Sequence, residues 1–158
     1  MKNLDKILDI DKFIALWAIE VMCCDWDGYT RNKNNYRFYY DNLTGKFTFF
    51  AHGKDQMFQN PGEGLVTGWS GLIARKIWST EDGRKRYIAK LKEVLEKHMK
   101  LDDLNKLVDA WALRLKDPLN AAQKGWGDQY VKNQVAGYKN RLKARVDYLT
   151  REIPKLKP

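Results

Sequence analysis

The sequence predicts a mainly α-helical protein with one small antiparallel β-hairpin. Long segments near both ends of the chain place apolar residues at helical spacing, whereas two short aromatic segments, 35–40 and 46–50, alternate as strands do. A glycine-rich stretch then separates this hairpin from the later helices. With 158 residues and 44% hydrophobic content the chain can bury a core, and we expect residues 1–158 to form a single domain or a domain fragment.

Residues 5–24 are predicted to form the core helix. Their apolar side chains build one broad face, which comprises Leu8, Phe13, Leu16, Trp17, Ile19 and Met22. Glu20 interrupts the most apolar part, which is also too short for a bilayer, so no membrane segment is expected. The adjacent Cys23 and Cys24 lack zinc-site spacing and are expected to be small buried side chains. The two cysteines therefore do not indicate whether the protein works in an oxidising or a reducing compartment.

Residues 25–58 are predicted to contain a catalytic loop, the hairpin and a metal-binding turn. The segments NYRFYY (35–40) and KFTFF (46–50) are rich in aromatic residues and alternate with period two. The connecting DNLTG supplies Asp, Asn and Gly, which suit a tight turn. The hairpin is the clearest strand prediction in the chain.

Residues 59–71 are predicted to be an irregular loop, and residues 72–153 a helical bundle. The loop contains Pro61 and several glycines. In the bundle, a short helix ends at Trp78, and Thr80 caps a second helix that runs to about residue 100. Leu104, Leu107, Val108, Trp111 and Leu115 then share one apolar face of a third helix, which Pro118 is expected to limit. The last helix is predicted over about 128–152.

The net charge of +9 is concentrated in the second half of the chain, over residues 80–158. A cationic half favours acidic partners such as nucleic acid or an anionic protein surface, and Arg141, Lys143 and Arg145 are its candidate contacts. Interleaved acidic residues such as Asp147 count against a continuous basic stripe. Nucleic-acid binding is therefore a minor alternative beside an ordinary solvated helical surface.

Between the first helix and the hairpin lies the clearest chemical signal. If Asp27 accepts a hydroxyl proton, a metal-binding amide is expected within a turn of loop, and Asn32 stands five residues later, with Asn34 and Asn35 directly after it. An amide oxygen binds Mg²⁺ without adding charge that repels phosphates. The antiparallel strands return Asp55 toward the loop, so these side chains can converge on metal ions at nucleotide phosphates. Asp, Asn and Gly also gather in turns for conformational reasons alone.

The run WDGYTRNKNNYRFYYDNLTGKFTFFAHGKDQMF (26–58) resembles the catalytic segment of the spore-coat protein H (CotH) kinase-like family of atypical protein kinases. The resemblance implies that Asp27 is the catalytic base. It implies Asn35, with Asn34 beside it, as a metal and cofactor contact, and Asp55 as the second metal ligand. Spacing alone favours Asn32 over Asn35 for the metal, and both remain open. In this family Mg²⁺ or Mn²⁺ acts with ATP, and the acceptor is a hydroxyl group of a protein substrate.

The resemblance covers about residues 10–152 and implies the larger lobe of an atypical kinase-like fold. Ala51 and Lys54 depart from the family pattern without touching the implied site residues. A strand-rich nucleotide-binding lobe has no counterpart before residue 5, so we expect a C-terminal part of such a kinase that is incomplete alone. The alternatives are a non-catalytic kinase-like scaffold and a basic helical module that binds an anionic partner. The family includes spore-coat and secreted members, so the localisation stays unknown.

Overall fold

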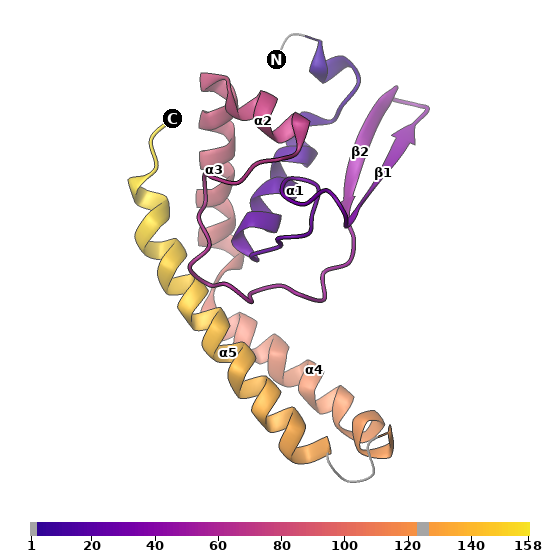
Figure 1. The fold of residues 1–158 in the computed structure, drawn as a ribbon, viewed down its shortest axis with the longest axis vertical. Helices are drawn as coiled ribbons and strands as arrows, with labels where there is room; N and C mark the ends of the chain where they lie inside the picture. Colours follow the sequence, from indigo (N-terminus) through magenta and orange to yellow (C-terminus); the bar gives the residue numbers. More distant parts are fainter. Residues whose placement is uncertain (1–2, 123–126) are drawn as a thin grey trace.

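A computed structural model describes residues 3–122 and 127–158 (Figure 1). It confirms a mainly α-helical fold with one antiparallel hairpin. The elements are η1 (Leu4–Lys6), α1 (Ile10–Met22), β1 (Tyr36–Asp41), β2 (Lys46–Ala51), α2 (Leu72–Trp78), α3 (Glu81–His98), α4 (Leu101–Ala122), α5 (Gly127–Glu152) and η2 (Ile153–Lys155). None of the described helices is long and apolar enough to cross a membrane.

Helix α1 occupies the centre of the fold, as the sequence predicts for its core helix. It begins after Asp9, whose carboxylate accepts a hydrogen bond from the backbone N–H of Lys12 at 3.1 Å and so caps the helix. Trp17 is fully buried and stacks on Tyr87 of α3, with ring centroids 3.9 Å apart. Ile19, expected in the same apolar face, is instead exposed near the end of the helix. Burial of the large aromatic rings makes the α1–α3 contact the main core of the protein.

The hairpin packs beside α1 through its inner strand, β2 (Figure 1). Its register pairs Tyr36 with Ala51 at one end and Asp41 with Lys46 at the other. The backbone of Phe47 exchanges hydrogen bonds with the segment before α1, at 2.8 Å and 3.0 Å. The ring of Phe49 meets that of Phe13 edge-on at 5.3 Å. The hairpin is therefore fixed to the core on one side, and β1 is its outer strand.

Helices α2 and α3 follow the loop and cover α1. The predicted cap at Thr80 is confirmed, because its hydroxyl accepts a hydrogen bond from the backbone N–H of Gly83 at 3.0 Å. Gly83 itself is required by a close approach, since a Cβ there would lie 1.9 Å from the carbonyl oxygen of Ile77. The turn between α2 and α3 is thus specified by local residues.

Helix α4 and the first part of α5 form an antiparallel pair that extends away from the rest of the fold, and the later part of α5 lies against the core, where Leu142 and Leu149 are buried (Figure 1). The prediction that Pro118 limits α4 is wrong, since the helix continues to Ala122. Proline removes the hydrogen bond to the carbonyl of Arg114, but that residue is exposed and water can take the place of the missing N–H. The inward placement expected for Trp111 is also wrong, because its side chain is 53% exposed.

Candidate functional site

The loop between α1 and β1 folds back on itself and brings Asp27 beside Asn35. The backbone carbonyl of Asp27 accepts hydrogen bonds from the N–H groups of Asn35 at 2.7 Å and Asn34 at 3.2 Å. Lys33 adopts a left-handed conformation, with φ of 62°, which lets the chain reverse before β1 begins. This local reversal of the chain places Asp27, the predicted base, next to Asn34 and Asn35, the predicted metal-binding amides.

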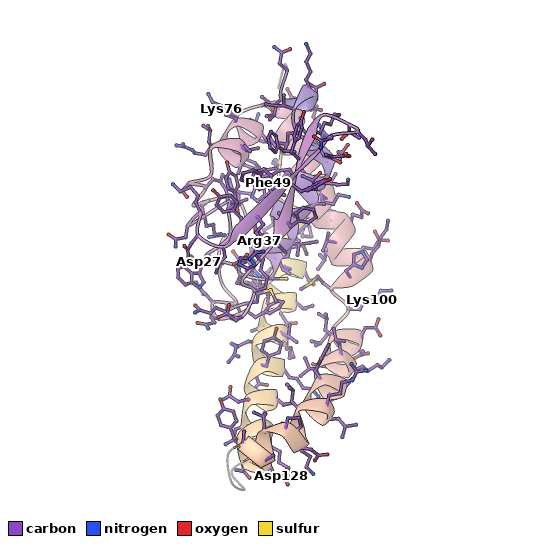
Figure 2. The ribbon with its side chains drawn as sticks, turned by 90° about the vertical axis from the view of Figure 1, so that its right-hand side faces the viewer. Asp27, Arg37, Phe49, Lys76, Lys100 and Asp128 are labelled. Atoms are coloured by element: carbon purple, nitrogen blue, oxygen red, sulfur yellow. The ribbon has the colours of Figure 1, made fainter. Side chains whose placement is uncertain are left out.

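Three amide groups donate hydrogen bonds to the Asp27 carboxylate. The donors are the Nδ2 atoms of Asn32 at 2.5 Å, Asn34 at 3.0 Å and Asn35 at 2.8 Å. Hydrogen bonds from Asn32 and Asn34 favour the charged carboxylate and lower the pKa of Asp27 below its ordinary value. Figure 2 shows Asp27 at the outer side of the loop, below the hairpin residues Arg37 and Phe49. The loop therefore presents an ionised carboxylate at the surface.

Asn35 is held in one orientation by the segment after the hairpin. Its Nδ2 atom also lies 3.3 Å from the backbone carbonyl of Gly53. A Cβ at Gly53 would lie 2.5 Å from Cγ of Asn35, and the φ of 62° there also favours glycine. The amide nitrogen donates to Asp27 and Gly53, and no hydrogen bond among the described residues occupies the Oδ1 atom of Asn35, which remains as an acceptor.

Asp55 lies on the turn that follows β2, between two residues attached to the loop. Before it, the ammonium group of Lys54 forms an ion pair with Asp25. After it, the Oε1 atom of Gln56 accepts a hydrogen bond from the indole of Trp26 at 3.1 Å. The Asp55 side chain is exposed and has no ion pair or hydrogen bond among the described residues. The hairpin thus returns Asp55 to the same side of the molecule as the loop.

The oxygen donors of this region suit a hard cation such as Mg²⁺. Such ions commonly use one or two carboxylates, neutral oxygens, water and phosphate rather than a full protein cage. Asp55 supplies a carboxylate, and Asn35 or Asn32 supplies an amide oxygen. The residues present therefore fit a magnesium ion. Among the described residues, no three His, Cys, Asp or Glu side chains come together as a metal-binding group. A cation in this region would therefore depend on amide oxygens as well as on Asp55.

A second, buried cluster lies directly beneath the loop, and sequence reasoning missed it. Glu20 is 2% exposed and Asp25 is 4% exposed, and the ammonium group of Lys54 pairs with both, at 3.2 Å from Oε1 of Glu20. Thr30 donates its hydroxyl hydrogen to the other oxygen of Glu20 at 3.0 Å. The sequence signal for this cluster was Glu20 itself, which stands in the apolar part of the first helix. A buried carboxylate needs a cation or a hydrogen-bond donor, and Lys54 supplies the cation.

Gly28 allows the loop backbone to lie against these buried carboxylates. A Cβ at that position would lie 2.6 Å from Oε1 of Glu20 and 2.7 Å from Oδ2 of Asp25. Burial raises the pKa of Glu20 above its ordinary value, although the charge of Lys54 opposes that rise. The ion-pair cluster beneath the loop therefore fixes the position from which Asp27 projects.

Arg145 does not contribute to a basic surface, which corrects its place among the candidate contacts for an anionic partner. It is 0% exposed, and its guanidinium donates to four backbone carbonyls. Two of these carbonyls are at the end of α1, Met22 at 3.1 Å and Val21 at 2.7 Å. The other two lie in the loop between the hairpin and α2, Pro61 at 2.9 Å and Glu63 at 2.7 Å. A cation at the carboxyl end of a helix is favourably placed in the helix dipole. Arg145 is therefore a structural residue.

The loop 59–71 is anchored at several points. Arg31 pairs with Glu63 at 2.6 Å, and the hydroxyl of Tyr87 donates to the carbonyl of Leu65 at 2.8 Å.

Comparison with protein families gives one match. The family model described as CotH kinase protein matches residues 1–153, which is nearly the whole chain. No curated protein matches the sequence.

Proposed function

The chain belongs to the CotH kinase family, and on that premise we propose that it carries the proton-accepting and metal-binding part of a phosphoryl-transfer site. The nucleotide would be ATP with Mg²⁺ or Mn²⁺, and the acceptor a hydroxyl group of a protein. The observation that carries the proposal is the geometry at Asp27, where three amides turn their nitrogens to one carboxylate and leave their oxygens for a cation. Asp55, on the adjoining turn, adds a second carboxylate.

In the proposed reaction, the Asp27 carboxylate accepts a hydrogen bond from the substrate hydroxyl and orients it. As the hydroxyl oxygen bonds to the terminal phosphorus of ATP, the bond from that phosphorus to the bridging oxygen breaks and ADP leaves. Asp27 receives the hydroxyl proton. Asn35 and Asp55 would hold the metal ion, with Asn32 as the alternative amide, and the metal would neutralise charge on the phosphates. Hydrogen bonds from Asn32 and Asn34 lower the pKa of Asp27 and keep it ionised, which is the form that can accept the proton.

The same geometry also fits a non-catalytic scaffold. A carboxylate has about four lone-pair sites, and three amides already donate to that of Asp27. On this alternative Asp27 only closes the loop, and the surface displays no reactive group.

The test uses the protein at its full length, with Asp27→Asn and Asp55→Ala as variants and Asp147→Asn as a matched control. Asp147 is an exposed aspartate of α5 that pairs with Lys143 at 2.6 Å. Calorimetry would measure metal-dependent ATP binding, and mass spectrometry would measure phosphate on protein hydroxyls. D27N is expected to bind ATP and lose transfer by about 100-fold or more, since a positioned base is worth that much. D55A is expected to lose metal-dependent ATP binding.

Undiminished transfer by D27N and D55A would refute the proposal. The scaffold alternative predicts no transfer by the unmodified protein, together with a lower melting temperature for D27N, because the loop loses its charged acceptor.

A further inference from the structure

An open apolar groove of about 720 Å³ runs along the α4–α5 pair, and Asp27 is not among the residues that line it. Its lining comes from α4, α5, the adjoining ends of α1 and α3, and the segment after the hairpin, and it includes Ile19, Met57, Met99, Leu107, Trp111 and Leu115. Several of these large side chains are about half exposed. A contiguous exposed apolar surface on a soluble protein commonly marks an interaction site.

The spacing of apolar residues in both helices identifies the kind of surface that is open. In α4 they recur at 101, 104, 108, 111 and 115, and in α5 at 131, 135, 138, 142 and 149, which are steps of three, four or seven. This is the heptad pattern of helices that pack side by side. Yet Trp111 is 53% exposed and Leu115 is 49% exposed, although both belong to the pattern. The α4–α5 contact therefore covers only one side of these residues, as in a three-helix bundle that lacks its third helix.

The one charged side chain that lines the groove, among the described residues, is basic. No aspartate or glutamate is among the described residues that line it. Arg141 lines one end, and its Nε atom is buried without a hydrogen-bond partner among the described residues. Arg114 lies over the ring of the lining residue Trp111, at 5.2 Å from the ring centroid. An occupant with carboxylates beside its apolar face is complementary to these groups.

We infer that the groove binds an amphipathic α-helix of a partner protein, with an apolar heptad stripe flanked by acidic residues. From Leu104 to Leu119 the groove follows α4 for about 22 Å, the length of a helix of about 15 residues. A second copy of this chain is a poorer occupant, because each copy carries a net charge of +9 and would bring the same arginines together. Helix-in-groove recognition supplies the affinity through apolar anchors and the specificity through flanking charges.

The test measures binding of designed helical peptides to the 158-residue chain. One peptide of about 18 residues carries leucine at the heptad core positions and glutamate beside them; a second has the same leucines with lysine beside them. Fluorescence anisotropy at low and moderate salt would give both dissociation constants. The acidic peptide is expected to bind at least about tenfold more tightly, and the difference should shrink with salt because flanking charges are screened. Equal affinity of the two peptides would overturn the inference.

Three variants locate the site. Trp111→Glu is expected to abolish binding of the acidic peptide, and Arg141→Gln to weaken it by about tenfold, with helical content checked by circular dichroism. Leu43→Glu is the matched control, because Leu43 is 98% exposed at the tip of the hairpin and takes the same kind of substitution outside the groove. Binding that survives W111E, or is lost equally in L43E, would contradict the inference. Sedimentation of the chain alone would refute it if the chain forms a dimer that W111E dissociates, since the groove would then hold a second copy.

Discussion

Replacing Arg145 with methionine tests whether one buried cation holds the end of α1 to the loop that follows the hairpin. Methionine keeps a similar unbranched stem and removes only the guanidinium. The perturbation therefore isolates the four hydrogen bonds to the carbonyls of Val21, Met22, Pro61 and Glu63.

The expected magnitude follows from which of these carbonyls water can reach. The bonds to Val21 and Met22 are buried. The variant leaves the Met22 carbonyl unsatisfied, at a cost of about 1–3 kcal/mol, whereas the Val21 carbonyl keeps the N–H of Cys24 at 3.1 Å and loses one of its two bonds, at about 1 kcal/mol. The bonds to Pro61 and Glu63 are only partly buried, and water can replace the donor there. Desolvation lowers the pKa of Arg145, which means that burying its charge has a cost the variant avoids. We expect the free energy of unfolding to fall by about 3 kcal/mol, a large part of the usual total.

Urea denaturation followed by tryptophan fluorescence would measure this loss. Arg151→Met is the matched control, because Arg151 also lies against the ring of Tyr148, at 5.5 Å compared with 5.0 Å for Arg145. Arg151 is exposed and, among the residues that the structure describes, forms its ion pair with the neighbouring Glu152, at 2.7 Å, so its loss should cost less than about 1 kcal/mol. A loss in R145M no larger than that in R151M would refute the reasoning.

Two further changes probe the loop and the cluster beneath it. Lys54→Met should lower the free energy of unfolding by about 3–5 kcal/mol at neutral pH, because two buried carboxylates lose their cation. Burial already holds the pKa of Glu20 above its ordinary value, so the folded protein takes up a proton there before the unfolded chain does as the pH falls. Part of the lost stability should therefore be recovered as the pH falls toward the ordinary pKa of a glutamate. A pH-independent loss in urea titrations would contradict this. Asn32→Ala should raise the lowered pKa of Asp27 toward its ordinary value, because Asn32 is the main donor; carbon-detected NMR titration would measure the shift, and an unchanged pKa would exclude that cause. Asp27 stabilises the fold above its unfolded pKa, so this acid-sensitive part of the stability should shrink in the variant.

Features with local causes were predictable from the sequence. The hairpin follows from alternating aromatic residues around DNLTG, and the Thr80 cap from one hydroxyl before an acidic first turn. The grouping of Asn32, Asn34 and Asn35 around Asp27 is local as well, since all lie within one loop of a few residues.

Features that depend on distant partners were not predictable. Lys54 read as a departure from a family pattern, and only the fold shows that it neutralises Glu20, 34 residues earlier. Arg145 read as a surface cation because charge gives no indication of burial when its acceptors lie elsewhere in the chain. Trp111 read as a core residue because periodicity identifies an apolar face but not whether a neighbour covers it. Pro118 was taken as a helix end, although an exposed helix tolerates one missing bond.

The sequence separation across the Arg145 contacts has a consequence for the order in which the protein is made. Arg145 stands 123 and 124 residues after the two α1 carbonyls it binds, and 82 and 84 residues after those of the loop. While the chain emerges from the ribosome, α1, the Asp27 loop and the hairpin are all synthesised before this cation exists. Contacts of such separation form late, because the intervening chain must first be closed into a loop. The segment with the chemical groups therefore reaches its final form only when α5 is complete, and it is not a module that can be transplanted without the C-terminal helix.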